Sequence, residues 1–122
     1  MAKTILTVDD SASMRQMIKL TLSGAGYDVT EANDGAQGLA TARGKAFDMV
    51  LTDLNMPGMD GVSMIKEIRK LQTYTGIPIV LLTTESDAEK KAQAKAAGAT
   101  GWITKPFQPE QLLSVTKKVL GQ

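Results

Sequence analysis

The feature that most restricts how this chain can fold is an alternation of short apolar runs with segments of helical spacing, repeated five times. Several of the runs are nearly continuous in apolar and β-branched residues, which is typical of strands buried on both faces of a parallel sheet. Parallel neighbours need crossover connections, and helices provide them with a right-handed path. The pattern predicts an α/β sandwich with a parallel sheet between helices. The expected strands cover residues 4–8, 27–32, 49–53, 79–83 and 101–105.

The segments between these runs carry helix signals. Ser11 or Ser13 can cap a first helix that ends at Gly24, and Pro109 suits the first turn of a last one. The run at 27–32 contains charged residues, so we expect it at an edge of the sheet. The first expected helix starts after Ser11 or Ser13 and ends at residue 24. The other expected helices cover residues 35–43, 62–71, 87–97 and 109–120.

Composition narrows the class of function. The chain has 122 residues, enough for one domain, and a net charge of +1, which gives no electrostatic case for nucleic acid or an anionic membrane. It has no run long enough to span a membrane and no signal-peptide pattern, so a cytoplasmic protein is expected. Cysteine and histidine are both absent. Any chemistry must therefore use carboxylates, hydroxyls and lysines.

Potentially reactive side chains follow four of the five apolar runs: Asp9 and Asp10, Asp53, Thr83 and Lys105. The carboxyl ends of parallel strands lie at one edge of a sheet, where ligands of open α/β folds bind. Converging carboxylates repel one another and favour a hard cation such as Mg²⁺. An aspartate beside Mg²⁺, an ammonium group and a hydroxyl is equipped to accept a phosphoryl group.

Each of these residues also has an ordinary explanation. Asp9 and Asp10 can serve as helix caps before Ser11, and a lone aspartate after a strand is most often a turn residue. Lys105 before a proline can simply end a strand. The conjunction at successive strand ends, in this order and spacing, is far more specific than any single part.

The residues at these strand ends resemble a known family. From Ile5 to the last helix, the chain resembles the receiver domain of two-component response regulators, in particular the stand-alone chemotaxis (CheY-like) type. The resemblance implies a flavodoxin-like three-layer sandwich with strand order 2-1-3-4-5 and five helices. It is carried by Val8-Asp-Asp-Ser11, Asp53-Leu-Asn-Met-Pro-Gly-Met-Asp-Gly61, Leu81-Leu-Thr83, Gly98-Ala99 and Lys105-Pro-Phe107.

The resemblance also implies roles for the acidic residues. Asp53 would accept a phosphoryl group from the phosphohistidine of a histidine kinase. Asp10 would bind Mg²⁺ directly and Asp9 through water, with Asp53 and the backbone carbonyl of Asn55 as further ligands. Mn²⁺ is expected to substitute for Mg²⁺. The protein would then assist its own phosphorylation and dephosphorylation, without being an enzyme that acts on other substrates.

The remaining implied roles concern the phosphoryl group and its surroundings. Thr83 and Lys105 would each bind a phosphoryl oxygen, and the bond from Lys105 to Pro106 would be cis. Asn55 and Glu85 match positions that tune the lifetime of the phosphoryl group, although solvated loop polarity explains them equally well. Thr84 stands where a smaller residue is usual, and it could narrow access to the site.

A switch is implied as well, in which Thr83 moves toward the phosphoryl group and an aromatic residue on the fifth strand responds. That residue here is Trp102, where tyrosine or phenylalanine is more usual, and the alternative is a partly exposed tryptophan that packs without switching. The fourth helix carries small residues, so it should bury little and shift at low cost. These small residues are Ala88, Ala92 and Ala96.

The leading function is a binding module that phosphorylation switches on or off. Its target protein would bind a surface made of the fourth helix, fifth strand and last helix. A stand-alone monomer of residues 1–122 without an output domain is expected, with a flagellar motor switch as one implied target. A receiver excised from a larger regulator is the alternative. The expected target surface includes Lys91, Lys95, Trp102 and Gln108.

Two other classes compete with this function. A Mg²⁺-dependent phosphatase of the haloacid-dehalogenase type would carry an acid two positions after its nucleophile, whereas this chain has Asn55, which cannot protonate a leaving group. A flavin or nucleotide carrier should have a first loop rich in glycine or hydroxyl groups, whereas Asp9 and Asp10 would repel phosphate.

Overall fold

In the computed structural model, which describes residues 2–84 and 88–121, five strands form one parallel sheet in the order β2-β1-β3-β4-β5. Both the sheet type and the strand order are as predicted, and β2 lies at an edge. The strands are β1 (Thr4–Val8), β2 (Asp28–Ala32), β3 (Met49–Asp53), β4 (Ile79–Thr83) and β5 (Gly101–Thr104).

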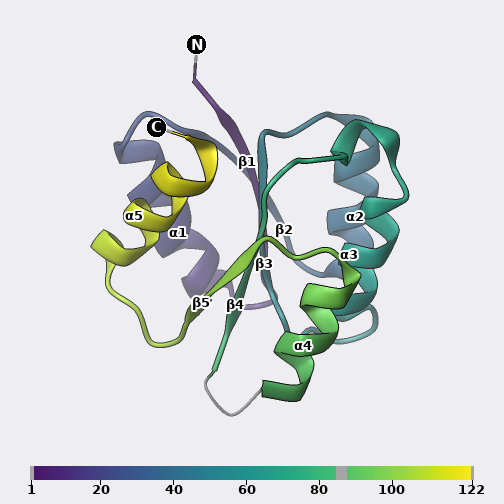
Figure 1. Cartoon of the computed structure of the whole chain (residues 1–122). Coiled ribbons are helices and arrows are strands. Elements are labelled where there is room, and N and C mark those ends of the chain that lie inside the picture. The colour runs from purple at the N-terminus through teal and green to yellow at the C-terminus, as the bar shows by residue number, and fades with distance from the viewer. Residues whose placement is uncertain (1, 85–87, 122) are drawn as a thin grey trace.

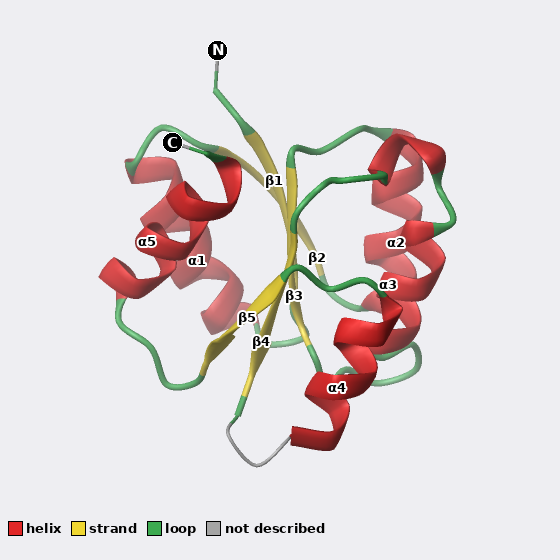
Figure 2. Cartoon of the chain, in the orientation of Figure 1, coloured by secondary structure: helices red, strands yellow, loops and turns green. Residues whose placement is uncertain are grey.

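Helices cover both faces of this sheet, which gives the expected three layers (Figures 1 and 2). α1 and α5 lie together on one face, and α2, α3 and α4 lie on the other. A short 3₁₀ turn, η1 (Gln72–Tyr74), follows α3. The α-helices are α1 (Ala12–Gly24), α2 (Gly35–Gly44), α3 (Gly61–Arg69), α4 (Ala88–Ala97) and α5 (Pro109–Leu120).

The helix ends follow from local chemistry. Of the two candidate caps for α1, the Oγ of Ser11 accepts a hydrogen bond from the Met14 amide at 3.3 Å, so Ser11 is the cap. Asp34 caps α2 and Asp60 caps α3 in the same way. Pro109 begins α5 as predicted. Three expected elements are longer than the observed ones: β2 starts only at Asp28, α3 stops at Arg69 and β5 stops before Lys105.

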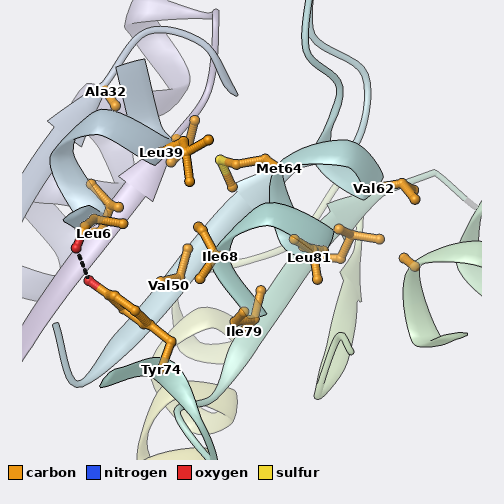
Figure 3. Packing of buried hydrophobic residues seen from close by; sticks show 14 of the residues in the cluster. Leu6, Ala32, Leu39, Val50, Val62, Met64, Ile68, Tyr74, Ile79 and Leu81 are labelled. Atoms are coloured by element: carbon orange, nitrogen blue, oxygen red, sulfur yellow. Dashed lines mark hydrogen bonds between the residues drawn. The ribbon is translucent and has the colours of Figure 1, made fainter. Parts of the chain in front are cut away.

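A hydrophobic core fills the space between the sheet and each helical layer. Figure 3 shows the larger cluster, in which side chains of α2 and α3 pack on the sheet. Every residue of β3 is buried, and so is every residue of β4. These two strands therefore cannot shift without disturbing both layers, and their ends make a rigid base for a site. The residues of the larger cluster that Figure 3 labels are Leu6, Ala32, Leu39, Val50, Val62, Met64, Ile68, Tyr74, Ile79 and Leu81.

The fourth helix has fewer buried residues than any other described α-helix, which agrees with the prediction that it buries little. Ala94 is its buried residue, whereas Ala88, Ala92 and Ala96 are exposed. The partly buried Ala97 also packs against the core, and methyl groups bury far less apolar surface than a leucine side chain does.

The hydroxyl of Tyr74 generates the first prediction. Its single proton is shared between the carbonyl oxygens of Ala42 at 2.9 Å and Lys45 at 2.7 Å, and its oxygen accepts from the Phe47 amide at 3.3 Å. Tyr74→Phe removes the hydroxyl and leaves buried backbone groups without their partner. We expect the free energy of unfolding to fall by about 1–3 kcal/mol, measured by urea denaturation. Thr41→Val, which removes a hydroxyl bond at the helix surface, should change it by less than about 0.5 kcal/mol. Equal effects of the two variants would contradict the prediction.

Candidate functional site

The strand ends bring three carboxylates together. Asp9 follows β1, Asp10 comes next, and Asp53 ends β3, the neighbour of β1 in the sheet. One carboxylate oxygen from each lies within 4.8 Å of the other two. Asp9 and Asp53 are buried, whereas Asp10 is exposed. The cluster is therefore open to solvent on the side of Asp10 and closed by the sheet beneath it.

Asp53 is held from two directions. The Nζ of Lys105 lies 2.9 Å from Asp53 Oδ1, and the Leu54 amide donates to the same oxygen at 2.9 Å. Lys105 directly follows β5, and its peptide bond to Pro106 is cis, as the resemblance implies. The ammonium group supplies positive charge inside an acidic cluster, where it offsets part of the repulsion.

Asp9 is the most buried member, with 1% of its surface exposed. Its Oδ1 accepts from the Ser11 amide at 2.9 Å, and its Oδ2 has no hydrogen-bonding partner in residues 2–84 and 88–121. Burial raises the pKa of Asp9 above its ordinary value, and the charges of Asp53 and Asp10 act in the same direction; the Ser11 amide and Lys105 oppose them. A buried carboxylate oxygen without a partner, in a group of three acids, fits a divalent cation.

Thr83 ends β4 beside this cluster. The side chain is buried, with its hydroxyl 3.3 Å from the Thr84 carbonyl to which it donates, and its own carbonyl accepts from the Lys105 amide at 2.7 Å. Backbone pairing between the ends of β4 and β5 thus fixes Lys105 relative to Thr83. Thr84 is exposed, and Glu85 lies outside the described residues.

Two lysines at the start of α4 make contacts that the sequence analysis did not predict. Lys90 donates to the side-chain oxygen of Asn55 at 2.9 Å, which ties α4 to the loop after Asp53. Lys91 lies over the Trp102 ring, 5.5 Å from its centroid. Trp102 is 45% exposed and belongs to the surface of β5. The lysine-rich composition of this helix was visible in the sequence, but nothing local indicated these partners.

Gly61 has a steric role that the sequence analysis missed, because there it was only the last residue of the motif that begins at Asp53. A Cβ atom at this position would lie 2.5 Å from the Asp53 carbonyl oxygen and 3.0 Å from the Leu54 Cα. The Gly61 amide also donates to the Leu54 carbonyl at 2.9 Å. The start of α3 therefore presses directly on the backbone of the acidic site, and only glycine fits there.

The comparisons with known proteins agree with this geometry. The model of the family described as "Response regulator receiver domain" matches residues 5–117. Chemotaxis protein CheY1 of Helicobacter pylori is 41% identical over 119 residues, which cover 96% of each chain. The structure of chemotaxis protein CheY4 of Vibrio cholerae is 47% identical, with a TM-score of 0.93 and coverage of 98% of this chain and 99% of that one.

The chain is also similar to a receiver domain of lower sequence identity and to longer regulators. The receiver domain of the sensor histidine kinase PA1611 of Pseudomonas aeruginosa, solved with a magnesium ion in its active-site cleft, is 29% identical with a TM-score of 0.91 over both whole chains. Other curated relatives are longer transcriptional and DNA-binding regulators, and this chain spans about half of their length.

No helix in residues 2–84 or 88–121 is both long and apolar enough to cross a membrane.

The parallel sheet with an acidic cluster and a lysine at its carboxyl edge defines the class of this protein: an α/β receiver fold built around an aspartate. The family match over most of the chain and the near full-length relatives are decisive. This chain belongs to the response regulator receiver family of two-component signalling systems.

The pKa of Asp9 generates a stability prediction. Because that pKa is higher in the folded protein than in the unfolded chain, ionisation destabilises the fold as pH rises through the folded pKa. Asp9→Asn should therefore raise the free energy of unfolding by about 1 kcal/mol at pH 7 in EDTA. The gain should shrink as pH falls toward the ordinary aspartate pKa of about 4. Urea denaturation at several pH values measures it, with Asp28→Asn on the exposed side of β2 as a control that should show no gain. A loss of stability at pH 7 would contradict the assignment.

The close approach of Gly61 to the Asp53 carbonyl leads to another stability prediction. Gly61→Ala places a methyl group against the Asp53 and Leu54 backbone, so we expect a loss of about 1–3 kcal/mol in unfolding free energy. Gly44→Ala is the matched control, because a Cβ there would meet nothing within 4 Å. That variant should be neutral or slightly more stable, since alanine loses less backbone entropy. Thermal unfolding of both variants measures the difference, and similar midpoints would refute the steric argument.

Proposed function

We propose that this receiver is operated by phosphorylation of Asp53. The phosphodonor is the phosphohistidine of a histidine kinase, and the reaction needs a divalent cation. The observation that carries the proposal is the Lys105 ammonium group 2.9 Å from a carboxylate that also lies among two other acids. A purely structural ion pair would not need Asp9 and Asp10 beside it, because they only add repulsion.

The chain's own groups suit the transfer. A carboxylate oxygen of Asp53 attacks phosphorus in line, an O–P bond forms, and the N–P bond to the imidazole breaks. The electron pair of that bond stays on the ring nitrogen. The attacking oxygen would be Oδ2, because Oδ1 is already held by both the Leu54 amide and Lys105. Lys105 and the buried Thr83 hydroxyl are the groups expected to bind the oxygens of the transferred group. Positioning and charge neutralisation of this kind account for most of the catalysis in phosphoryl transfer.

The cation would be Mg²⁺, with Mn²⁺ as a substitute, held by Asp9, Asp10, Asp53 and the Asn55 carbonyl. Its contribution is neutralisation of charge on the transferred group. The buried Asp9 oxygen without a protein partner supports this assignment, as does the magnesium ion of the PA1611 receiver. The protein thus assists its own phosphorylation and dephosphorylation, with Asn55 and Glu85 as the residues that tune the lifetime of the phosphoryl group.

The output is a change in partner binding on α4, β5 and α5. Lys91 and Trp102 are in contact on this surface, and Lys95 and Gln108 are exposed on it. We propose that Thr83 and Trp102 respond together when Asp53 is phosphorylated. The CheY relatives, matched over nearly their full length, support a stand-alone monomer of residues 1–122 that acts in chemotaxis. Its target would be a downstream protein such as a flagellar motor switch.

The phosphatase alternative is not favoured. Asn55 cannot act as a general acid, and its side-chain oxygen is engaged by Lys90. The nucleotide-carrier alternative would place phosphate against Asp9 and Asp10, which the acidic cluster opposes.

Labelling by a small phosphodonor tests the proposal. Incubation with acetyl phosphate and Mg²⁺ should add one phosphoryl group to the wild-type protein, seen by intact-mass spectrometry, and none to Asp53→Asn. EDTA should abolish the labelling because the three acids then repel the donor. Asp28→Asn, an exposed aspartate on β2, is the matched control and should be labelled like the wild type. Equal labelling of Asp53→Asn would reject the proposal. Trp102 fluorescence recorded in the same samples reports whether β5 responds.

A further inference from the structure

The loop that carries Asp9 and Asp10 is held by a residue outside the acidic cluster. Arg15, on the first turn of α1, donates from Nη1 to the backbone carbonyl of Asp9 at 2.6 Å. Its Nε lies 3.4 Å from the carboxylate of Glu31 on β2, and the arginine side chain is only 15% exposed. The guanidinium group thus bridges the acidic loop and the neighbouring strand.

This bridge completes the fixation of Asp9. The Asp9 amide donates to the Ala32 carbonyl at 3.2 Å, and its Oδ1 accepts from the Ser11 amide at 2.9 Å. With Arg15 on the carbonyl, the amide, the carbonyl and the side chain of one residue are all bound. A carbonyl bonded to a rigid, anchored guanidinium has little freedom to rotate. The backbone direction into Asp10, the exposed acid, is set by the same peptide group.

We propose that Arg15 is a positioning residue that sets the affinity of the Asp9–Asp10–Asp53 cluster for a divalent cation. This proposal rests on the function proposed above, because it assumes that the cluster binds such a cation. Arg15 would act through the Asp9 carbonyl and would not touch the cation. Groups of this kind, which orient ligands from behind, commonly change metal affinity by 10- to 100-fold when they are removed.

Charge and position predict opposite results for the loss of Arg15. A positive charge close to the cluster repels a cation, so removing that charge should strengthen binding if electrostatics alone mattered. Removing the hydrogen bond to the Asp9 carbonyl should weaken binding if position matters. The direction of the change therefore separates the two effects.

Lys19 provides a matched control on the same helix. Its Nζ lies 3.6 Å from the other oxygen of the Glu31 carboxylate, and its side chain is 52% exposed. This ion pair, between described residues, does not involve Asp9 or Asp10. Lys19→Met removes the same charge and the same kind of partner from Glu31 as Arg15→Met does, but leaves the acidic loop untouched.

The experiment is a titration of each full-length protein with Mn²⁺, in which bound ion is measured as the loss of the free-ion electron paramagnetic resonance signal. Competition with Mg²⁺ gives the affinity for that ion. Arg15→Met should weaken binding about 10-fold, whereas Lys19→Met should leave it unchanged or strengthen it. Unchanged or tighter binding by folded Arg15→Met would overturn the proposal.

Circular dichroism and urea denaturation show whether Arg15→Met folds. If it does not fold, a second variant, Arg15→Lys, tests the same role. Arg15→Lys keeps the charge but loses the planar fork that joins the Asp9 carbonyl to Glu31, so it should also bind Mn²⁺ several-fold more weakly. Wild-type affinity in Arg15→Lys, when Arg15→Met cannot be measured, would overturn the role of Arg15. A merely structural role would lower stability without changing affinity in the folded protein. Absence of Mn²⁺ binding by the wild type would instead reject the metal site of the proposed function.

Discussion

Repulsion among three carboxylates that two neighbouring strands deliver to one point is the constraint on which the rest of this structure depends. Asp9 and Asp53 are buried at the ends of β1 and β3, within reach of Asp10. Hydrophobic packing of those strands in both layers holds the acids together, since nothing in the acids themselves favours it. Lys105 offsets part of the repulsion, and the negative charge that remains is of the kind that a cation would neutralise.

The site and the surface of β5 are connected through a helix that the core holds only weakly. α4 buries Ala94 and little else, while adjacent residues at its start contact Asn55 on one side and Trp102 on the other. Asn55, two residues after Asp53 in the chain, is thus bonded to the end of α4 that carries Lys90. A lightly packed element between two such contacts can change its position at low cost, whereas the strands beneath it cannot.

Much of the site was predictable because strand ends of a parallel sheet share one edge. The positions of Asp9, Asp10, Asp53, Thr83 and Lys105 needed only the apolar runs before them. The contacts of Arg15, Lys90 and Gly61 were not predictable in this way. Glu31 shows why: at the end of an edge strand it contributes nothing to the acidic cluster, yet it anchors Arg15 from a neighbouring element. Partners of long side chains depend on distances between elements, which no local pattern encodes.

By itself, the sequence determined the class of fold, the strand order through family resemblance, and which residue types stand at the strand ends. Periodicity and turn chemistry suffice for this because they act over a few neighbouring residues. Only the tertiary structure decided that Ala94 is the residue of α4 that faces inward, that one Asp9 oxygen is buried without a protein partner, and that α3 begins against the Asp53 carbonyl. These features depend on how closely separate elements pack. Differences of a few tenths of an ångström in these packing distances are set by the whole core together.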